Sequence, residues 1–311
     1  MHLRKDMGTI AYSKRKKGGK WMLKKATVGD YINYTALTII SLSMLFPFFY
    51  VISVSLTDPN SYVAGELILI PKDFSLEAYK VVLQSGQLWN SLSSTLFITI
   101  IGTILNLCFT MTFAYVLSKK EIPGWKFFTY LVLFILVFNA GLIPNYLLIR
   151  EMGLMNSLWA LILPGLTNPW ALFVVRSFYT TIPKSIEEAA LIDGANDLQI
   201  FYKLILPLSK PVVAAFALFF AVGLWNTYLN GVFFIQDPAK WPLQVFLSQM
   251  IIESNSALGS VTDYHLHNEV PPPSETIKMA SLVLVMLPIL VVYPFLQKYF
   301  AKGVLIGSVK G

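Results

Sequence analysis

The sequence predicts an all-α integral membrane protein with six transmembrane helices. Residues of the AVILMFWYC set make up 55% of the 311 residues, charged residues make up only 13%, and the mean hydropathy is +0.61. A soluble domain carries about 25% charged residues, so this chain has too few polar side chains to cover a globule of its size. Its large apolar fraction argues against disorder, and a single cysteine, Cys108, excludes an internal disulfide framework.

Six stretches are long and apolar enough to cross about 30 Å of hydrocarbon as helices of roughly 20 residues. They cover residues 34–56, 91–117, 127–149, 157–178, 211–236 and 279–297. Prolines in the third and fourth stretches, Pro144, Pro164 and Pro169, are expected to break or kink those helices.

The chain accordingly divides into a basic N-terminal segment, a six-span domain and a C-terminal tail, over residues 1–30, 31–300 and 301–311. The outer loops are expected at about 57–90 and 237–276. Nineteen of the 24 lysine and arginine residues lie on the side of the N-terminus when six spans are drawn. This bias predicts that both termini are cytoplasmic in a multi-pass protein of the cell membrane. The basic run 14–20 is expected to contact anionic lipid rather than nucleic acid.

Several kinds of chemistry have no support in the sequence. The span interiors contain no Asp, Glu, Lys, Arg or His, which argues against a proton-coupled carrier. The chain has no phosphate-binding G-x-x-x-x-G-K-[ST] loop, so any driving ATPase would be another chain. His265 and His267 lack a third ligand on their side of the membrane, so no metal site is expected. The chain itself is not expected to be an enzyme.

The most informative segment, about 183–210, connects the fourth and fifth stretches. Ser185 and Glu188 have the spacing of a capping box, which predicts the start of a short helix. Glu187 and Glu188 would lie in its first turn, where the helix dipole favours negative charge.

The second half of this segment predicts another short helix. Gly194 is placed to end the first helix in a left-handed turn. Asn196 or Asp197 can cap the next helix, which Pro207 would stop. From the residues alone, a projecting helix pair and an ordinary amphipathic surface loop remain equally open.

A family resemblance rests on the same segment. Glu188-Ala189-Ala190, Gly194 and Leu204-x-Leu206-Pro207, at this spacing, resemble the EAA motif of ABC importer permeases, although Leu204 stands where the family usually has isoleucine. The tail 297–303 is similar to that of carbohydrate-type importers and, within these, of the maltose permease G-subunit branch. The runs 139–146 and 270–273 resemble the LplC/YtcP-like permeases more closely still. The resemblance covers roughly residues 30–311.

The resemblance implies an ABC importer permease fold in which the EAA loop is a coupling helix. That helix would sit in a cleft of a dimeric cytoplasmic ATPase, which binds ATP and Mg, while this chain carries no cofactor. A second homologous permease subunit, an extracytoplasmic solute-binding protein and an oligosaccharide substrate are implied as partners. The implied coupling residues are Glu187, Glu188, Ala189, Ala190, Asp193, Gly194, Leu204, Leu206 and Pro207.

A substrate path is predicted along the fifth stretch. Its polar and aromatic residues are Trp225, Asn226, Thr227, Tyr228 and Asn230. Amides and aromatic rings suit sugar hydroxyls and sugar faces, but small and amide residues also hold membrane helices together, and both interpretations remain open. The alternative functions are import of another polar solute, such as a polyol or a glycerol-phosphate diester, and secondary transport.

Overall fold

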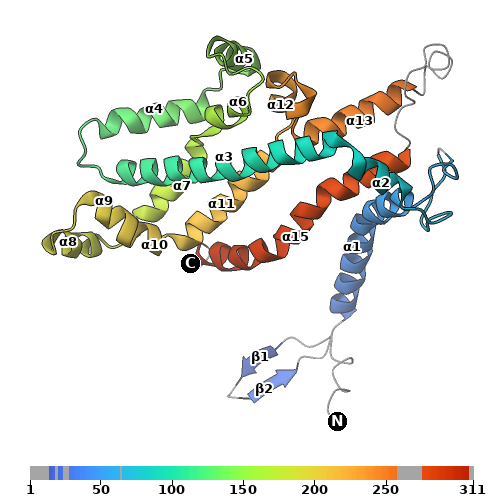
Figure 1. Ribbon diagram of the computed structural model, residues 1–311. Coiled ribbons are helices and arrows are strands. Elements are labelled where there is room, and N and C mark those ends of the chain that lie inside the picture. Colours follow the sequence, from blue (N-terminus) through green and yellow to red (C-terminus); the bar gives the residue numbers. More distant parts are fainter. Residues whose placement is uncertain (1–13, 18–19, 24–27, 64, 258–274, 308–311) are drawn as a thin grey trace.

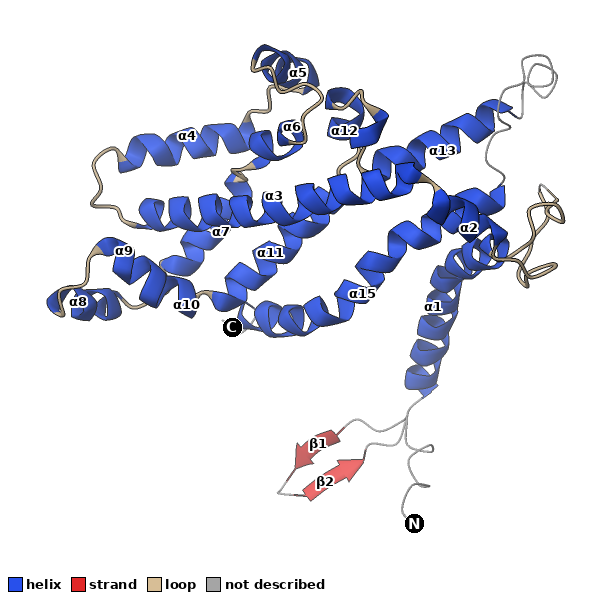
Figure 2. Cartoon of the chain, viewed as in Figure 1, coloured by secondary structure: helices blue, strands red, loops and turns tan. Residues whose placement is uncertain are grey.

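The computed structural model describes residues 14–17, 20–23, 28–63, 65–257 and 275–307. This part of the chain is helical apart from one short hairpin and its connecting loops (Figure 1, Figure 2). In the hairpin, β1 (Lys14–Lys17) pairs antiparallel with β2 (Lys20–Leu23). The sequence predicted no strand, so the hairpin corrects the all-helical expectation within the basic segment.

The first two predicted spans are confirmed as continuous helices. α1 (Val28–Ser55) and α3 (Gly86–Ser118) are both long and apolar enough to cross a membrane. A third long helix, α15 (Glu275–Gly307), packs along α1. The short helix α2 (Glu77–Gln84) also packs on α15.

The third predicted span is two helices rather than one. α4 (Trp125–Val137) and α5 (Leu142–Glu151) meet at an angle of 118°. Pro144 has no N–H and would clash with the carbonyl four residues before it, so α5 cannot continue α4. Gly141 takes a positive φ of 88° at the corner, and its N–H donates to the Asn139 side chain at 2.9 Å.

The fourth predicted span is also broken, as its prolines predicted. It consists of α6 (Trp159–Ile162), a 3₁₀ turn (Leu163–Gly165) and α7 (Pro169–Tyr179). Asn168 caps α7 because its side-chain oxygen accepts a hydrogen bond from the Ala171 N–H at 3.0 Å.

The fifth predicted span ends early and leads into unexpected helices. α11 (Lys210–Trp225) is followed by the separate helix α12 (Leu229–Phe234). The region expected as an outer loop then contains a 3₁₀ turn (Pro238–Lys240) and α13 (Leu243–Ala257). The predicted polar stripe is therefore not on one continuous helix.

The helix α3 lies at the centre of the packing (Figure 1). Its Leu117 belongs to a buried cluster with α7 and residues 200–205. Its Leu88 belongs to a second cluster with α2, α13 and α15, and its Ile98 to a third cluster with α5, α6 and α12. One rigid helix thus connects the packing at both ends of the molecule.

Gly102 is where α3 and α11 approach most closely among the described glycines of these helices. A Cβ atom at Gly102 would lie 2.7 Å from Leu224 Cδ1, whereas one at Gly223 on α11 would meet nothing within 4 Å. We predict that Gly102→Leu destabilises the protein by about 1–3 kcal/mol through overpacking. Gly223→Leu is the matched control and should leave the thermal unfolding midpoint in detergent unchanged or raised. Equal midpoints for the two variants would contradict this packing.

Candidate coupling site

The segment predicted to couple to a partner lies beside the end of α3 (Figure 1). Its first helix is α8 (Lys184–Ile192), and no residue of α8 is buried. The predicted capping box is wrong, because the N-cap is Pro183, α8 begins before Ser185, and no side chain caps it. Pro183 has the extended backbone that a residue ahead of a helix needs, so α8 starts earlier than the S-x-x-E spacing suggested.

The glycine corner after α8 is confirmed. Gly194 has a φ of 81°, a conformation that glycine adopts without strain. The Ala195 N–H then donates to the Ala190 carbonyl at 2.9 Å. Of the two predicted caps for the next helix, α9 (Asp197–Ile200), Asn196 is the one used, in a full capping box with Gln199.

Pro207 does not stop the helix that follows. The chain continues from α9 through a π-helical turn (Phe201–Ile205) into the short helix α10 (Leu206–Leu208), which contains Pro207. The wide turn lets the Leu206 N–H reach the Phe201 carbonyl, five residues back. This π-helical turn directly precedes the helix that contains Pro207, and Pro207 has no N–H to donate to the carbonyl four residues before it.

The motif residues divide into an anchored set and an outward set. The anchored set contacts the buried cluster under the loop and consists of Ala190, Leu204 and Leu206. The outward set is exposed and consists of Glu188, Ala189, Asp193, Gly194 and Pro207. Exposed apolar side chains adjoin it, with Ile192 87% and Leu198 68% exposed. The tip of the loop is therefore an apolar surface with carboxylates, suited to contact another protein.

The two adjacent glutamates have different environments. Glu187 turns toward the body and pairs with Lys119, and their side chains are only 19% and 27% exposed. Glu188 is exposed and makes no ion pair with another described residue. The helix is thus rotated so that Glu187 faces the protein and Glu188 faces outward.

The loop after α3 holds α8 through further charges. Glu121 lies 3.5 Å from Lys184 in an exposed pair. A hydrogen bond within its own backbone lowers the pKa of Glu121, and the Lys184 charge lowers it further. Partial burial lowers the pKa of Lys119, while the Asp197 and Glu121 carboxylates oppose that change. Sequence reasoning missed Lys119 and Glu121, because their partners lie more than sixty residues away.

Trp125 fixes the other end of the same loop. Its indole N–H donates to the Leu117 carbonyl at 2.7 Å. The Arg176 guanidinium lies 5.0 Å from the Trp125 ring centroid and 5.9 Å from that of Phe173. The end of α3, the start of α4 and the end of α7 are thereby joined.

The predicted substrate-path residues lie at the break between α11 and α12. Trp225 does not fit the predicted substrate path, because its side chain is buried in the cluster with α13 and α15. Asn226 and Asn230 are exposed, and Thr227 is half-buried. The Tyr228 ring is 38% exposed.

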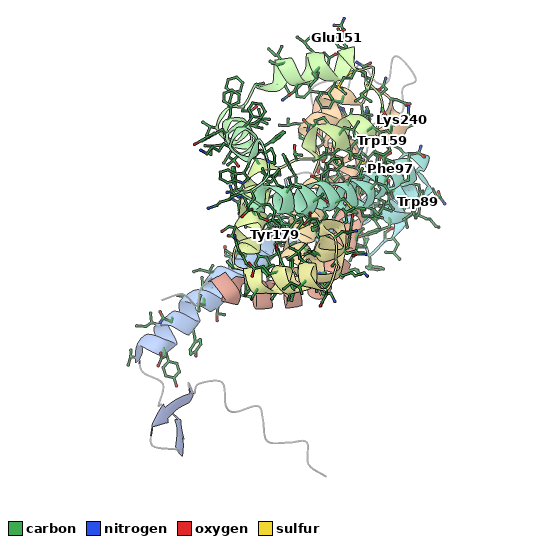
Figure 3. All side chains as sticks on the ribbon, turned by 90° about the vertical axis from the view of Figure 1, so that its left-hand side faces the viewer. Trp89, Phe97, Glu151, Trp159, Tyr179 and Lys240 are labelled. Atoms are coloured by element: carbon green, nitrogen blue, oxygen red, sulfur yellow. The ribbon has the colours of Figure 1, made fainter. Side chains whose placement is uncertain are left out.

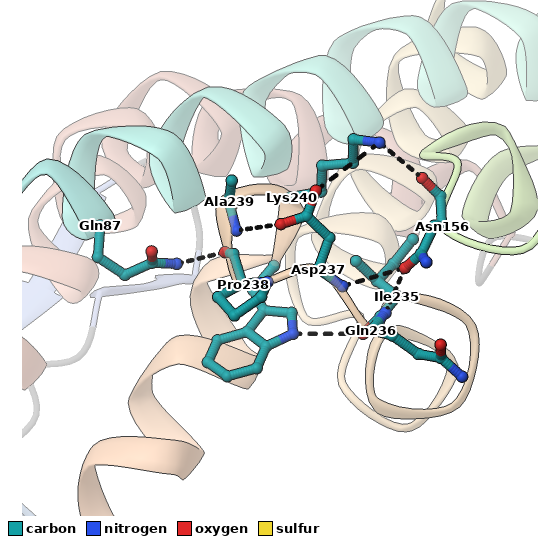
Figure 4. Close-up of polar contacts among 9 residues, drawn as sticks. Gln87, Asn156, Ile235, Gln236, Asp237, Pro238, Ala239 and Lys240 are labelled. Atoms are coloured by element: carbon teal, nitrogen blue, oxygen red, sulfur yellow. Dashed lines mark hydrogen bonds and ion pairs between the residues drawn. The ribbon is translucent and has the colours of Figure 1, made fainter.

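Away from α8, hydrogen bonds to Asn156 join two connections between helices (Figure 4). We call this set of hydrogen bonds the Asn156 lock. Asn156 has a φ of 59°, and its side-chain oxygen accepts hydrogen bonds from the N–H groups of Gln236 and Asp237 at 2.6 and 3.0 Å. Its backbone carbonyl accepts a hydrogen bond from Lys240 Nζ at 3.1 Å. Asn156 thus ties the α5–α6 connection to the one that follows α12.

An open surface pocket of about 350 Å³ adjoins this lock. Its walls include Phe97, Trp159 and Lys240, which lie on the same side of the molecule (Figure 3). The Phe97 and Trp159 rings meet edge to face with centroids 5.7 Å apart. Within the described residues, no cluster of three or more His, Cys, Asp or Glu side chains could hold a metal ion.

Comparison with known proteins gives a consistent result. Residues 125–306 match the family model described as "Binding-protein-dependent transport system inner membrane component". The chain is 42% identical over 282 residues to the polygalacturonan/rhamnogalacturonan transport system permease protein YtcP of Bacillus subtilis, covering 91% of this chain and 98% of the relative. It is also 42% identical to the protein LplC of Bacillus subtilis over 288 residues, covering 93% and 97%.

A solved structure is similar over most of its length. It comes from a bacterial ABC transporter involved in the import of the acidic polysaccharide alginate. The two chains have a TM-score of 0.79 and 33% sequence identity, over 89% of this chain and 99% of the other.

The Asn156 lock generates a stability prediction. Asn156→Ala removes two hydrogen bonds, which contribute about 1 kcal/mol each to stability. It also puts alanine in the left-handed backbone conformation, which costs about 1–2 kcal/mol for residues other than Gly, Asn and Asp. We expect a loss of about 2–4 kcal/mol, measured as a lower thermal midpoint of the purified protein. Asn156→Asp retains an acceptor oxygen and tolerance of this backbone, so it should stay close to wild type. A midpoint for Asn156→Ala equal to that of Asn156→Asp would rule out the lock.

Proposed function

Because the chain belongs to the family of binding-protein-dependent transport system inner membrane components, we propose that it is a permease subunit of an ATP-driven importer of oligosaccharides. The observation that carries the proposal is the 42% identity to a sugar-polymer transport permease over 91% of this chain. The outward tip of α8 adds support, because an exposed apolar surface with a free carboxylate suits a partner protein better than water.

We propose that the six apolar stretches form six crossings. α1, α3 and α15 would each cross as one helix, while α4 with α5, α6 with α7, and α11 with α12 would cross as broken helices. Both termini and α8 would then lie in the cytoplasm, as the lysine and arginine distribution favours. α13 and the Asn156 lock would lie on the outer side, accessible to a solute-binding protein.

Coupling would run through α8. A dimeric ATPase would receive α8 in a cleft, with Glu188 paired to a basic residue, and ATP and Mg would be bound there rather than by this chain. Closure of the ATPase dimer would then move α8, and the Lys119–Glu187 pair would carry that movement to α3. A second permease subunit would complete the path.

Reconstitution tests the function directly. The chain is co-expressed with the second permease, the ATPase and the binding protein, and the purified complex is placed in proteoliposomes. ATP-dependent uptake of labelled oligogalacturonides or arabinooligosaccharides is the expected result. Uptake that does not depend on ATP but depends on an ion gradient would favour a secondary carrier. Complete absence of sugar binding by the partner binding protein would favour another polar solute.

Orientation can be tested with single cysteines in a Cys108→Ser background. Lys120→Cys lies in the exposed connection after α3, and Asn60→Cys lies in the exposed connection after α1. We predict that an impermeant maleimide labels Asn60→Cys in intact cells and labels Lys120→Cys only after the membrane is permeabilised. The reverse pattern would invert the topology.

The neighbouring glutamates allow a matched test of coupling. If Glu188 is buried against a basic residue of the ATPase, removing its charge should cost on the order of 3–5 kcal/mol. We predict that Glu188→Gln impairs transport strongly and that Glu188→Lys impairs it more, because it adds like-charge repulsion. Since α8 has no side-chain cap, loss of a capping interaction cannot produce this result.

The comparison variant is Glu187→Gln, which removes the charge that Lys119 pairs with inside this chain. We expect it to weaken the hold of the body on α8 while the complex still binds the ATPase. Normal transport by both Glu188 variants, with the ATPase bound at wild-type levels, would remove Glu188 from coupling.

A further inference from the structure

The break between α11 and α12 is joined to α13 by a set of polar contacts. Gln244 Nε2 donates to Asn226 Oδ1 at 3.3 Å, and the hydroxyls of Tyr228 and Ser248 are 2.9 Å apart. The Asn226 amide also donates to the Val222 carbonyl at 2.8 Å. These contacts bring together two segments that the sequence placed in a span and in an outer loop.

The position of α13 is fixed independently of these contacts. The Leu243 N–H at its start donates to the buried Thr95 hydroxyl of α3 at 2.8 Å. α12 packs closely against it, because a Cβ at Gly231 would lie 2.7 Å from Val245 Cγ2. Phe246 and Leu247 are buried in the cluster with α2 and α15. Gln244 and Ser248, one helical turn apart, are therefore held on the edge of α13 that meets the break.

The depth of the break determines what it can face. α11 begins at Lys210 and rises about 24 Å over its 16 residues, which is within the roughly 30 Å thickness of the hydrocarbon. Irregular backbone at that depth occurs only where it is buried in protein or lines water. Asn226 is exposed in this chain, and Tyr228 is partly so. This surface therefore cannot face lipid.

The chemistry of the four side chains points to hydroxyl groups. Two amides and two hydroxyls can each donate and accept hydrogen bonds, and none of them carries a charge. These contacts use the Gln244 side-chain nitrogen and leave its side-chain oxygen, Oε1, without a hydrogen-bond partner among the described residues. Tyr228 adds a partly exposed ring that can cover the apolar face of a sugar.

We propose that Gln244 and Ser248 of α13, together with Asn226 and Tyr228, form a binding site for sugar hydroxyls in the outer half of the translocation path. The inference rests on the proposed function, since it requires that α11 crosses the membrane and that sugars pass. It assigns α13 a role as a wall of the path. The competing occupant is the second permease subunit, whose helices could pack on the same polar surface.

The test compares Gln244→Leu and Ser248→Ala with Gln249→Leu, a matched change on the same helix outside the cluster. Each variant is reconstituted as the full complex, and uptake of labelled trigalacturonate and arabinotriose is measured over a range of concentrations. We expect Gln244→Leu to raise the sugar concentration for half-maximal uptake roughly tenfold, as the loss of a hydrogen bond in a closed site does. Ser248→Ala should act in the same direction, and Gln249→Leu should match wild type.

Assembly and labelling distinguish the alternatives. Ser248→Cys in a Cys108→Ser background should react with a maleimide in the assembled complex and be protected by the transported sugar. Loss of the second permease from purified Gln244→Leu complexes would overturn the proposal in favour of an inter-subunit contact. Wild-type uptake by both variants, without protection of the cysteine, would also overturn it. Failure of the wild-type complex to import either sugar would instead reject the proposed function itself.

Discussion

A helix that is interrupted within a bilayer exposes N–H and C=O groups that no water can satisfy, and this chain interrupts its apolar stretches repeatedly. Asparagine side-chain oxygens accept backbone N–H groups at three of these breaks, after α4, after α5 and after the 3₁₀ turn. The amide oxygen accepts hydrogen bonds, so it can replace a missing backbone carbonyl. These hydrogen bonds supply partners for N–H groups that the interrupted helices leave without an intrahelical carbonyl.

The breaks also determine where polar surface is available. An unbroken apolar helix offers only packing faces, as α3 does along α7 and α11. Two of the interruptions instead leave polar side chains exposed. The corner at Gly194 carries α8 away from the body, and the break at Asn226 exposes amides beside α13. The exposed tip of α8 and the polar surface beside α13 thus both lie where the backbone is irregular.

Composition and hydropathy predicted the membrane class and the first two spans, because long apolar runs translate directly into helix length. The breaks within the spans were harder to predict, because hydropathy averaged over a whole span hides a three-residue turn such as 226–228. The Asn168-Pro169 pair was a visible helix-start signal. The start of α8 was misplaced because S-x-x-E spacing does not require that its serine be the cap. Contacts such as Lys119–Glu187 left no local trace in the sequence.

The Lys119–Glu187 pair has a mechanical consequence. Lys119 directly follows α3, whose 33 residues extend about 50 Å as one rod. A displacement of α8 would therefore reach the C-terminal end of α3 through this pair, and α3 contacts α2 and α13 near its other end. Because α3 is one continuous helix, a tilt of it would displace both ends of the molecule together, without a series of local rearrangements between them.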